Sequence, residues 1–213
     1  MSKSRKLIAA AVFTAAAGLA LCLLEPRVRQ RFFTTSLWPW PLPWDTSESE
    51  LALLKELAEP GDILLESNLH GWQWIVLSLA GTGTTWVHAA LVDNQKRLLT
   101  VHKEAIETEW SLYREWRSTR LALIRPPYKN DEQKHGAIDF ARRNLGTPYD
   151  PSFRKHAGNC NGLVAEALTF AGIEVSPRKC WGRELYAPDC FFKIPEATLV
   201  WSSDRDRGKI NDD

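Results

Sequence analysis

Hydrophobic positions along the chain alternate between helical and strand-like spacing. Leu51, Leu54 and Leu57 share one helical face behind Ser47, a residue that can cap a helix over 47–57. Similar patterns predict helices over 73–79, 110–117 and 131–145, the last one ended by Gly146. Short apolar runs predict strands at 63–65, 85–92, 98–102, 121–124 and 191–201. The turn residues Asp93-Asn94 make the strands at 85–92 and 98–102 a hairpin, and this mixture favours an α+β fold over a doubly wound sheet.

The amino terminus differs from the rest of the chain. Leu7–Leu24 carries no charge and follows a basic start, which is typical of a signal anchor or a signal peptide over 1–25. An uncleaved anchor is favoured because no small-x-small cleavage site follows, and Leu21 before Cys22 is a poor lipoprotein signal. Residues 26–46 form a Trp- and Pro-rich linker. We therefore expect a membrane-anchored protein facing the periplasm of a bacterial inner membrane, or a secreted, periplasmic one if the signal is removed.

The remaining sequence is expected to form one domain over 47–205 and a polar tail over 206–213. Its composition of 44% hydrophobic residues with ten Trp argues against disorder. A net charge of +1 without a basic stripe gives no electrostatic basis for binding nucleic acid.

Cys160 is the residue most suggestive of chemistry. It follows Gly158-Asn159 and opens an apolar helical pattern that includes Leu163 and Val164 and is closed by Gly172. The unpaired amides at a helix N-terminus favour a thiolate, so Cys160 is a candidate nucleophile. A buried structural cysteine is the alternative.

A cysteine nucleophile needs a base within hydrogen-bond reach. No His follows Cys160, so the base must come from upstream, and His88 in an apolar strand is either a core residue or a positioned base. Residues 88, 90 and 92 share one strand face. If that face meets the Cys160 helix, His102 or Glu104 on the returning strand could orient His88.

The other cysteines leave two alternatives open. Cys180 and Cys190 lie in a loop-rich stretch, where they form either a disulfide or two free buried thiols. No zinc-ligand spacing is present, so neither a metal nor a cofactor is expected.

The cysteine region also resembles a known family. Gly146-x-Pro-Tyr149 followed by Cys160-x-Gly-Leu-Val164 is similar to the nucleophile region of the NlpC/P60 papain-like cysteine hydrolases. Those enzymes place the His after the Cys. Here Gly61-Asp-Ile-Leu64 and His88-Ala-Ala-Leu-Val92 precede it, an order that resembles the circularly permuted, YiiX/YebB-like and lecithin:retinol-acyltransferase-like branch.

This resemblance covers about residues 61–201 and carries expectations for fold and site. It implies an α+β, circularly permuted papain-like fold, an antiparallel sheet packed with helices, behind the N-terminal hydrophobic helix. It implies Cys160 as nucleophile, His88 as general base, Glu104 as third member with His102 as its rival, and Tyr149 as an oxyanion donor. Val87 stands where the family often has Ser, and Asn161 where it has Ser or Asp.

The function expected from these features is a membrane-anchored cysteine hydrolase, either a peptidase or amidase or an acyl hydrolase. It would cleave a small peptide, amide or lipid-like substrate through a thioester on Cys160. A catalytically silent binding module of the same fold and a thiol acyltransferase are the alternatives.

Overall fold

The computed structural model describes residues 45–68, 86–150, 158–180 and 182–203. The predicted anchor over 1–25, most of the linker over 26–46, the helix over 73–79 and the tail over 206–213 lie outside these residues. Within them, no helix is both long and apolar enough to span a bilayer.

A six-stranded antiparallel sheet forms the centre of the molecule, in the order β4-β3-β2-β1-β5-β8. It confirms the predicted hairpin and the strands at 63–65 and 121–124, and it adds β4, which the sequence pattern did not predict. A short separate hairpin, β6–β7, follows the last long helix. The strand bounds are β1 Ile63–Ser67, β2 His88–Val92, β3 Leu98–Val101, β4 Ala105–Thr108, β5 Arg120–Arg125, β6 Arg178–Cys180, β7 Arg183–Leu185 and β8 Thr198–Ser202.

Four α-helices among the described residues agree with the predicted ones: α3 Glu48–Leu57, α5 Ser111–Glu115, α6 Asp131–Arg143 and α7 Cys160–Phe170. α3 begins with a capping box, in which Ser47 Oγ accepts the Glu50 N–H and the Glu50 carboxylate accepts the Ser47 N–H. The strand predicted over 191–201 is wrong in its first half. Pro188–Lys193 forms a 3₁₀ helix, and β8 starts only after Pro195, a residue that has no N–H for a sheet ladder.

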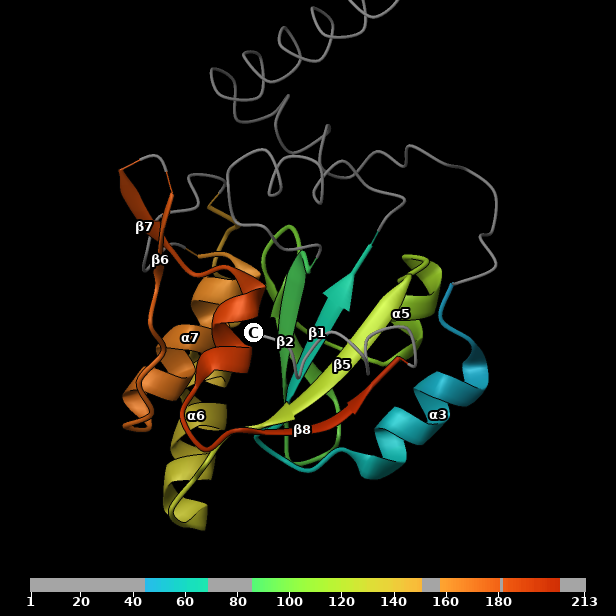
Figure 1. Cartoon of the computed structure of the whole chain (residues 1–213), viewed down its shortest axis with the longest axis horizontal. Helices are drawn as coiled ribbons and strands as arrows, with labels where there is room; N and C mark the ends of the chain where they lie inside the picture. Colours follow the sequence, from blue (N-terminus) through green and yellow to red (C-terminus); the bar gives the residue numbers. More distant parts are fainter. Residues whose placement is uncertain (1–44, 69–85, 151–157, 181, 204–213) are drawn as a thin grey trace, which may run out of the picture.

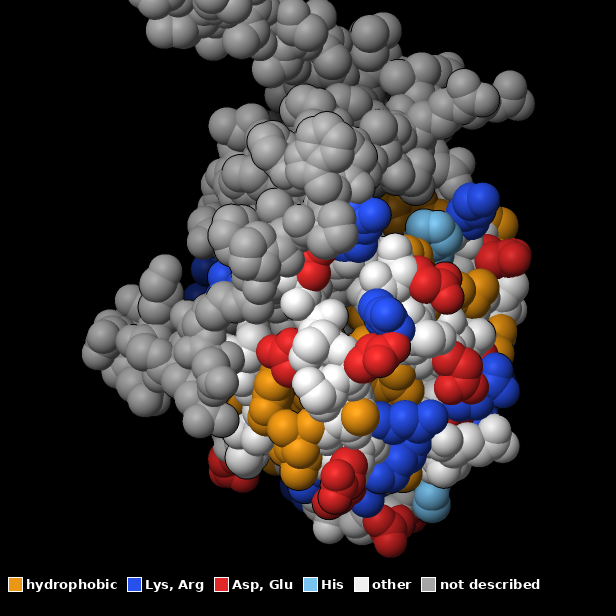
Figure 2. Space-filling view, turned by 90° about the vertical axis from the view of Figure 1, so that its right-hand side faces the viewer, with side chains coloured by type: hydrophobic (Ala, Val, Ile, Leu, Met, Phe, Trp, Pro, Cys, Tyr) orange, Lys and Arg blue, Asp and Glu red, His pale blue; other side chains and the backbone are white. Residues whose placement is uncertain are grey.

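The two faces of the sheet pack against different helices. α6 and α7 cover one face and contact Ala89 and Leu91 of β2, whereas α3 and α5 cover the other face with Ala90 and Val92. Figure 1 shows the sheet between these two helix pairs. The α3/α5 side of the surface, seen in Figure 2, carries basic and acidic side chains intermixed.

This layering determines where the predicted base lies. His88 has the same strand parity as Ala90 and Val92, and its ring lies against Tyr113 of α5. The even-numbered face of the hairpin therefore packs on α5, while α7 covers the odd-numbered face. The start of α7 nevertheless lies near the His88 end of this face, because the charge of Glu66 acts on the Cys160 thiol and Cys160 in turn acts on Tyr113.

Candidate active site

Cys160 is the first residue of α7, as the sequence predicts. The Asn159 side chain caps this helix by accepting the Gly162 N–H at 2.9 Å. The Cys160 side chain is buried, and the backbone N–H of Ala89 in β2 donates to its sulfur. Cys160, the candidate nucleophile, thus contacts the backbone of Ala89, which is adjacent to His88 in β2.

The expected thiolate is not what this environment favours. Burial is the largest influence on the Cys160 thiol and raises its pKa to about 11, although the amides of Ala89, Asn161 and Cys160 itself act to lower it. The charge of Glu66 raises this pKa further. The helix N-terminal amides act in the predicted direction, but desolvation outweighs them and the net pKa is raised. Cys160 is therefore a neutral thiol at neutral pH, and a base must remove its proton.

The hydrogen bonds around His88 determine which of its nitrogens is free. Nε2 of His88 lies 2.7 Å from the Thr100 hydroxyl oxygen, and that hydroxyl donates to the Ala89 carbonyl at 2.8 Å. A threonine hydroxyl has one proton, so Thr100 must accept from Nε2 of His88. The network assigns the Nε2–H tautomer to His88 and leaves the lone pair of Nδ1 available to take a proton.

His88 is held in a buried aromatic environment. Its ring centroid lies 6.1 Å from that of Tyr113 and 5.4 Å from that of Trp116, which directly follows α5. Burial lowers the pKa of His88 to about 3, and the charge of His102 acts in the same direction, so the imidazole is neutral at neutral pH. Within the described part of the chain no hydrogen bond joins Cys160 to His88 directly; the Ala89 N–H contacts the Cys160 sulfur, and the Ala89 carbonyl accepts from the Thr100 that holds His88.

The other predicted site residues lie around this pair without touching the imidazole nitrogens. The Glu104 side chain is exposed and has no hydrogen bond or ion pair with any described residue. The His102 ring lies 4.9 Å from that of Trp116, where its charge reaches His88. Tyr149 packs against the hydrophobic cluster that contains Cys160, and its backbone N–H donates to Lys103. Neither Glu104 nor His102 holds Nε2 of His88, because Thr100 does.

Three residues of this site were not recognised in the sequence: Glu66, Thr100 and Tyr113. Thr100 lies on the same hairpin face as His88, so strand alternation was the available signal for it. Glu66 is the register partner of His88 across β1 and β2. The Tyr113 hydroxyl is buried near Thr100, Glu66 and Cys160 and makes no hydrogen bond of regular geometry. No sequence signal distinguished Tyr113 from an ordinary core aromatic residue.

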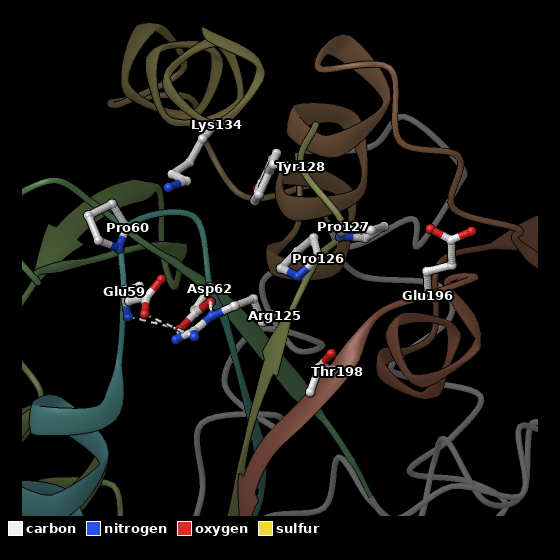
Figure 3. Close-up of a pocket in the computed structure, with 10 residues that line it drawn as sticks. All are labelled: Glu59, Pro60, Asp62, Arg125, Pro126, Pro127, Tyr128, Lys134, Glu196 and Thr198. Carbon is white, nitrogen blue, oxygen red and sulfur yellow. Dashed lines mark hydrogen bonds and ion pairs between the residues drawn. The ribbon is translucent and has the colours of Figure 1, made fainter. Parts of the chain in front are cut away.

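A cavity of about 270 Å³ lies apart from these residues, beside the opposite end of β1. Figure 3 shows Glu59, Asp62 and Arg125 meeting on one side of it, with Tyr128 and Lys134 nearer α6. Arg125 ion-pairs with both acids at 2.9 Å. The cavity contains none of the candidate catalytic residues.

Cys190 is a buried free thiol in the structure. The side chain of Cys180 lies outside the described residues, so the alternative of two free buried thiols stays a prediction. Among the described residues, no three His, Cys, Asp or Glu side chains lie close enough to hold a metal ion.

Comparison with known proteins finds a solved structure of similar fold. No protein-family model and no curated protein matches the chain. Among solved structures, the chain is similar to the crystal structure of the metalloprotein YiiX (DUF1105) from Escherichia coli O157:H7, with a TM-score of 0.58 and 19% identity over 69% of this chain and 98% of that chain. The chain has a YiiX-like fold. This confirms the YiiX-like part of the resemblance and the α+β architecture, while the wider NlpC/P60 assignment stays a prediction.

Proposed function

We propose that the protein is a papain-like cysteine hydrolase in which Cys160 is the nucleophile and His88 the general base. The observation that carries the proposal is the hydrogen-bond chain from His88 through Thr100 to the Ala89 carbonyl. This chain leaves Nδ1 of His88 unprotonated. His88 lies on β2, the same strand whose Ala89 contacts the Cys160 sulfur. A base of this kind is what a neutral thiol needs in order to react.

In the proposed reaction, the Cys160 thiol attacks the carbonyl carbon of an amide or ester as its proton moves to Nδ1 of His88. The imidazolium then gives that proton to the leaving amine or alcohol, which leaves an acyl thioester on Cys160. Water, deprotonated by His88, releases the acid and restores the thiol. The Cys160 backbone amide and the Tyr149 hydroxyl are the donors proposed for the oxyanion.

The proposal assigns the orienting role to Thr100 in place of Glu104 or His102. A hydroxyl can hold the imidazole tautomer but adds no negative charge beside the imidazolium. Attachment to a membrane through residues 1–25, a periplasmic location, and a small peptide, amide or lipid-like substrate remain part of the proposal.

An electrophilic acyl-type probe tests the function directly. We expect mass spectrometry to find the label on Cys160 of the full chain, and we expect Cys160→Ala and His88→Ala each to abolish it. Cys190→Ala is the matched control, since Cys190 is the other buried free thiol in the described residues and should not affect labelling. Labelling that persists in Cys160→Ala would rule out this nucleophile.

The raised pKa of Cys160 favours a second candidate, a catalytically silent binding module of the same fold. A desolvated thiol without a functioning base is inert. This alternative predicts that the wild-type protein shows no His88-dependent labelling at any pH between 6 and 9.

A further inference from the structure

β1 places a buried carboxyl directly opposite His88. Glu66 and His88 are register partners in the antiparallel β1–β2 pair. Directly opposite residues point to the same face of a sheet, with Cβ atoms about 4.5–5.5 Å apart. Both side chains are almost fully buried, at 2% and 8% exposure.

The partners of Glu66 distinguish it from the other buried acids. Asp62 and Asp93 each form an ion pair with an arginine, Arg125 and Arg142 respectively. Glu66 has no ion pair with any residue of the described segments. Its interactions are the Ser118 hydroxyl, which donates to Oε1 at 2.5 Å, and the Asn68 side chain.

A buried carboxyl without a cation is costly unless a positive charge forms beside it. Among the described residues, the one neighbour that gains a positive charge in the proposed reaction is His88. The imidazole is neutral at rest because it is buried, so the imidazolium needs a counter-charge within the same low-dielectric space. Thr100 does not supply one.

We propose that Glu66 is the acidic positioning residue of this site, whose carboxylate stabilises the His88 imidazolium when Nδ1 takes the Cys160 proton. This inference rests on the proposed function and deepens it. Glu66 acts through His88 and does not touch the substrate, and it replaces the exposed Glu104 as the acid of the site.

The ionisation of Glu66 is set by the groups that face it. Burial raises its pKa to about 7, while hydrogen bonds from Ser118 and Asn68 act to lower it. The titratable groups around it are His88 of β2, Tyr113 of α5 and Cys160 of α7, with His102 beyond His88. The active, ionised form of Glu66 is therefore present above about pH 7 and is lost as the pH falls through that value.

Glu66→Gln tests the inference, because the amide oxygen keeps the Ser118 hydrogen bond and only the charge is removed. The measurement is the rate of Cys160 labelling by the acyl-type probe from pH 5 to 9. We expect the wild-type rate to rise through about pH 7. In Glu66→Gln the rate should fall about tenfold at pH 8 and lose this step, since an opposite charge within about 4–6 Å shifts a pKa by about 1–3 units.

Glu107→Gln is the matched control, because it makes the same substitution in the same sheet, on β4, where Glu107 pairs with Arg97. It should leave both rate and pH profile unchanged. Wild-type behaviour of Glu66→Gln, with His88→Ala inactive, overturns the role of Glu66 and leaves the proposed function standing. Absence of labelling in the wild type instead counts against the proposed function.

If the wild type is not labelled, a measurement that needs no reaction still tests the role of Glu66. The imidazole resonances of His88, followed by NMR, should shift with an inflection near pH 7 in the wild type as Glu66 ionises. The inflection should be absent in Glu66→Gln. A wild-type His88 that is insensitive to pH between 6 and 8 would show that the Glu66 charge does not reach the imidazole.

Discussion

The two ends of β1 each carry a buried acid, but only one of them has a cation. At the first end, Asp62 accepts Nε and Nη2 of Arg125, both at 2.9 Å, and also the Glu59 N–H at 2.8 Å. At the other end, Glu66 has only the Ser118 hydroxyl and Asn68. The same strand thus holds one carboxylate in a complete hydrogen-bond set and one whose burial raises its pKa to about 7.

This difference indicates that Asp62 has a structural role and Glu66 a role in the proposed reaction. A carboxylate paired with a guanidinium holds the fold together, and removing its charge leaves the partner uncompensated. A carboxyl whose pKa is displaced by desolvation, beside a buried imidazole, is typical of a functional site. Neutralising the two acids should therefore have opposite effects on stability.

The largest expected effect is a gain in stability from Glu66→Gln. Because the folded-state pKa of Glu66 is raised from 4.5 to about 7, its protonated form contributes stability that is complete below pH 4.5 and lost as the pH rises to about 7. A glutamine never ionises. At pH 8 the free energy of unfolding of Glu66→Gln should exceed that of the wild type by up to about 3 kcal/mol.

Urea denaturation at pH 4 and pH 8 measures this gain. The two proteins should be nearly equal in stability at pH 4 and differ at pH 8. A variant that is less stable than the wild type at pH 8 would mean that the Glu66 carboxylate has a compensating partner.

Asp62→Asn should lower the free energy of unfolding, whereas Glu66→Gln should raise it. It leaves the Arg125 guanidinium without its charged partner at the end of β1, although Arg125 is about a third exposed and keeps Glu59. We expect a loss of about 2 kcal/mol in the free energy of unfolding at pH 8, at the low end for a broken buried pair because solvent reaches the arginine. Equal labelling of Cys160 in the folded variant would show that this end of β1 is structural.

Thr100 is expected to matter for activity more than for stability. Thr100→Val removes the acceptor of the His88 Nε2 proton while keeping the side-chain shape, and should cost about 1 kcal/mol of stability. The rate of Cys160 labelling should also fall in Thr100→Val. Thr100→Ser retains the hydroxyl and should restore the rate, and ¹⁵N NMR should find the Nε2–H tautomer in the serine variant but a mixture in the valine variant. A valine variant that keeps the wild-type rate and tautomer would contradict the assigned role.

Ser118→Ala has the smallest expected effect, a change in the pKa of Glu66. Its hydroxyl favours the ionised form of Glu66, so its loss should raise the pKa of that carboxyl. The rise in labelling rate should move toward higher pH by about one unit. A shift toward lower pH would show that the hydroxyl stabilises the protonated acid instead.

Much of the fold could be predicted from local pattern, because the relevant interactions are local. The Ser47 cap, the β2–β3 hairpin and the start of α7 at Cys160 each depend on residues only a few positions apart. The N-terminal hydrophobic segment stays a prediction.

The site was harder to predict because it depends on long-range packing. Strand alternation shows which residues share a face with His88, but it does not show which helix covers that face. Glu66 is opposite His88 only through the pairing of β1 with β2, and it directly follows the strand predicted at 63–65. The burial that raises the pKa of Cys160 likewise depends on its docking against β2, so helix position alone did not predict the net direction of the pKa shift.

The central claim is that Cys160 reacts through His88 under the control of Glu66. The most direct test is the pH dependence of Cys160 labelling, measured side by side in the wild type, His88→Ala and Glu66→Gln. The account predicts a rate that rises through about pH 7 in the wild type, is lost in His88→Ala, and is slower and without that step in Glu66→Gln. A rate that is the same in all three proteins and rises only toward pH 11, as for an unassisted buried thiol, would contradict it.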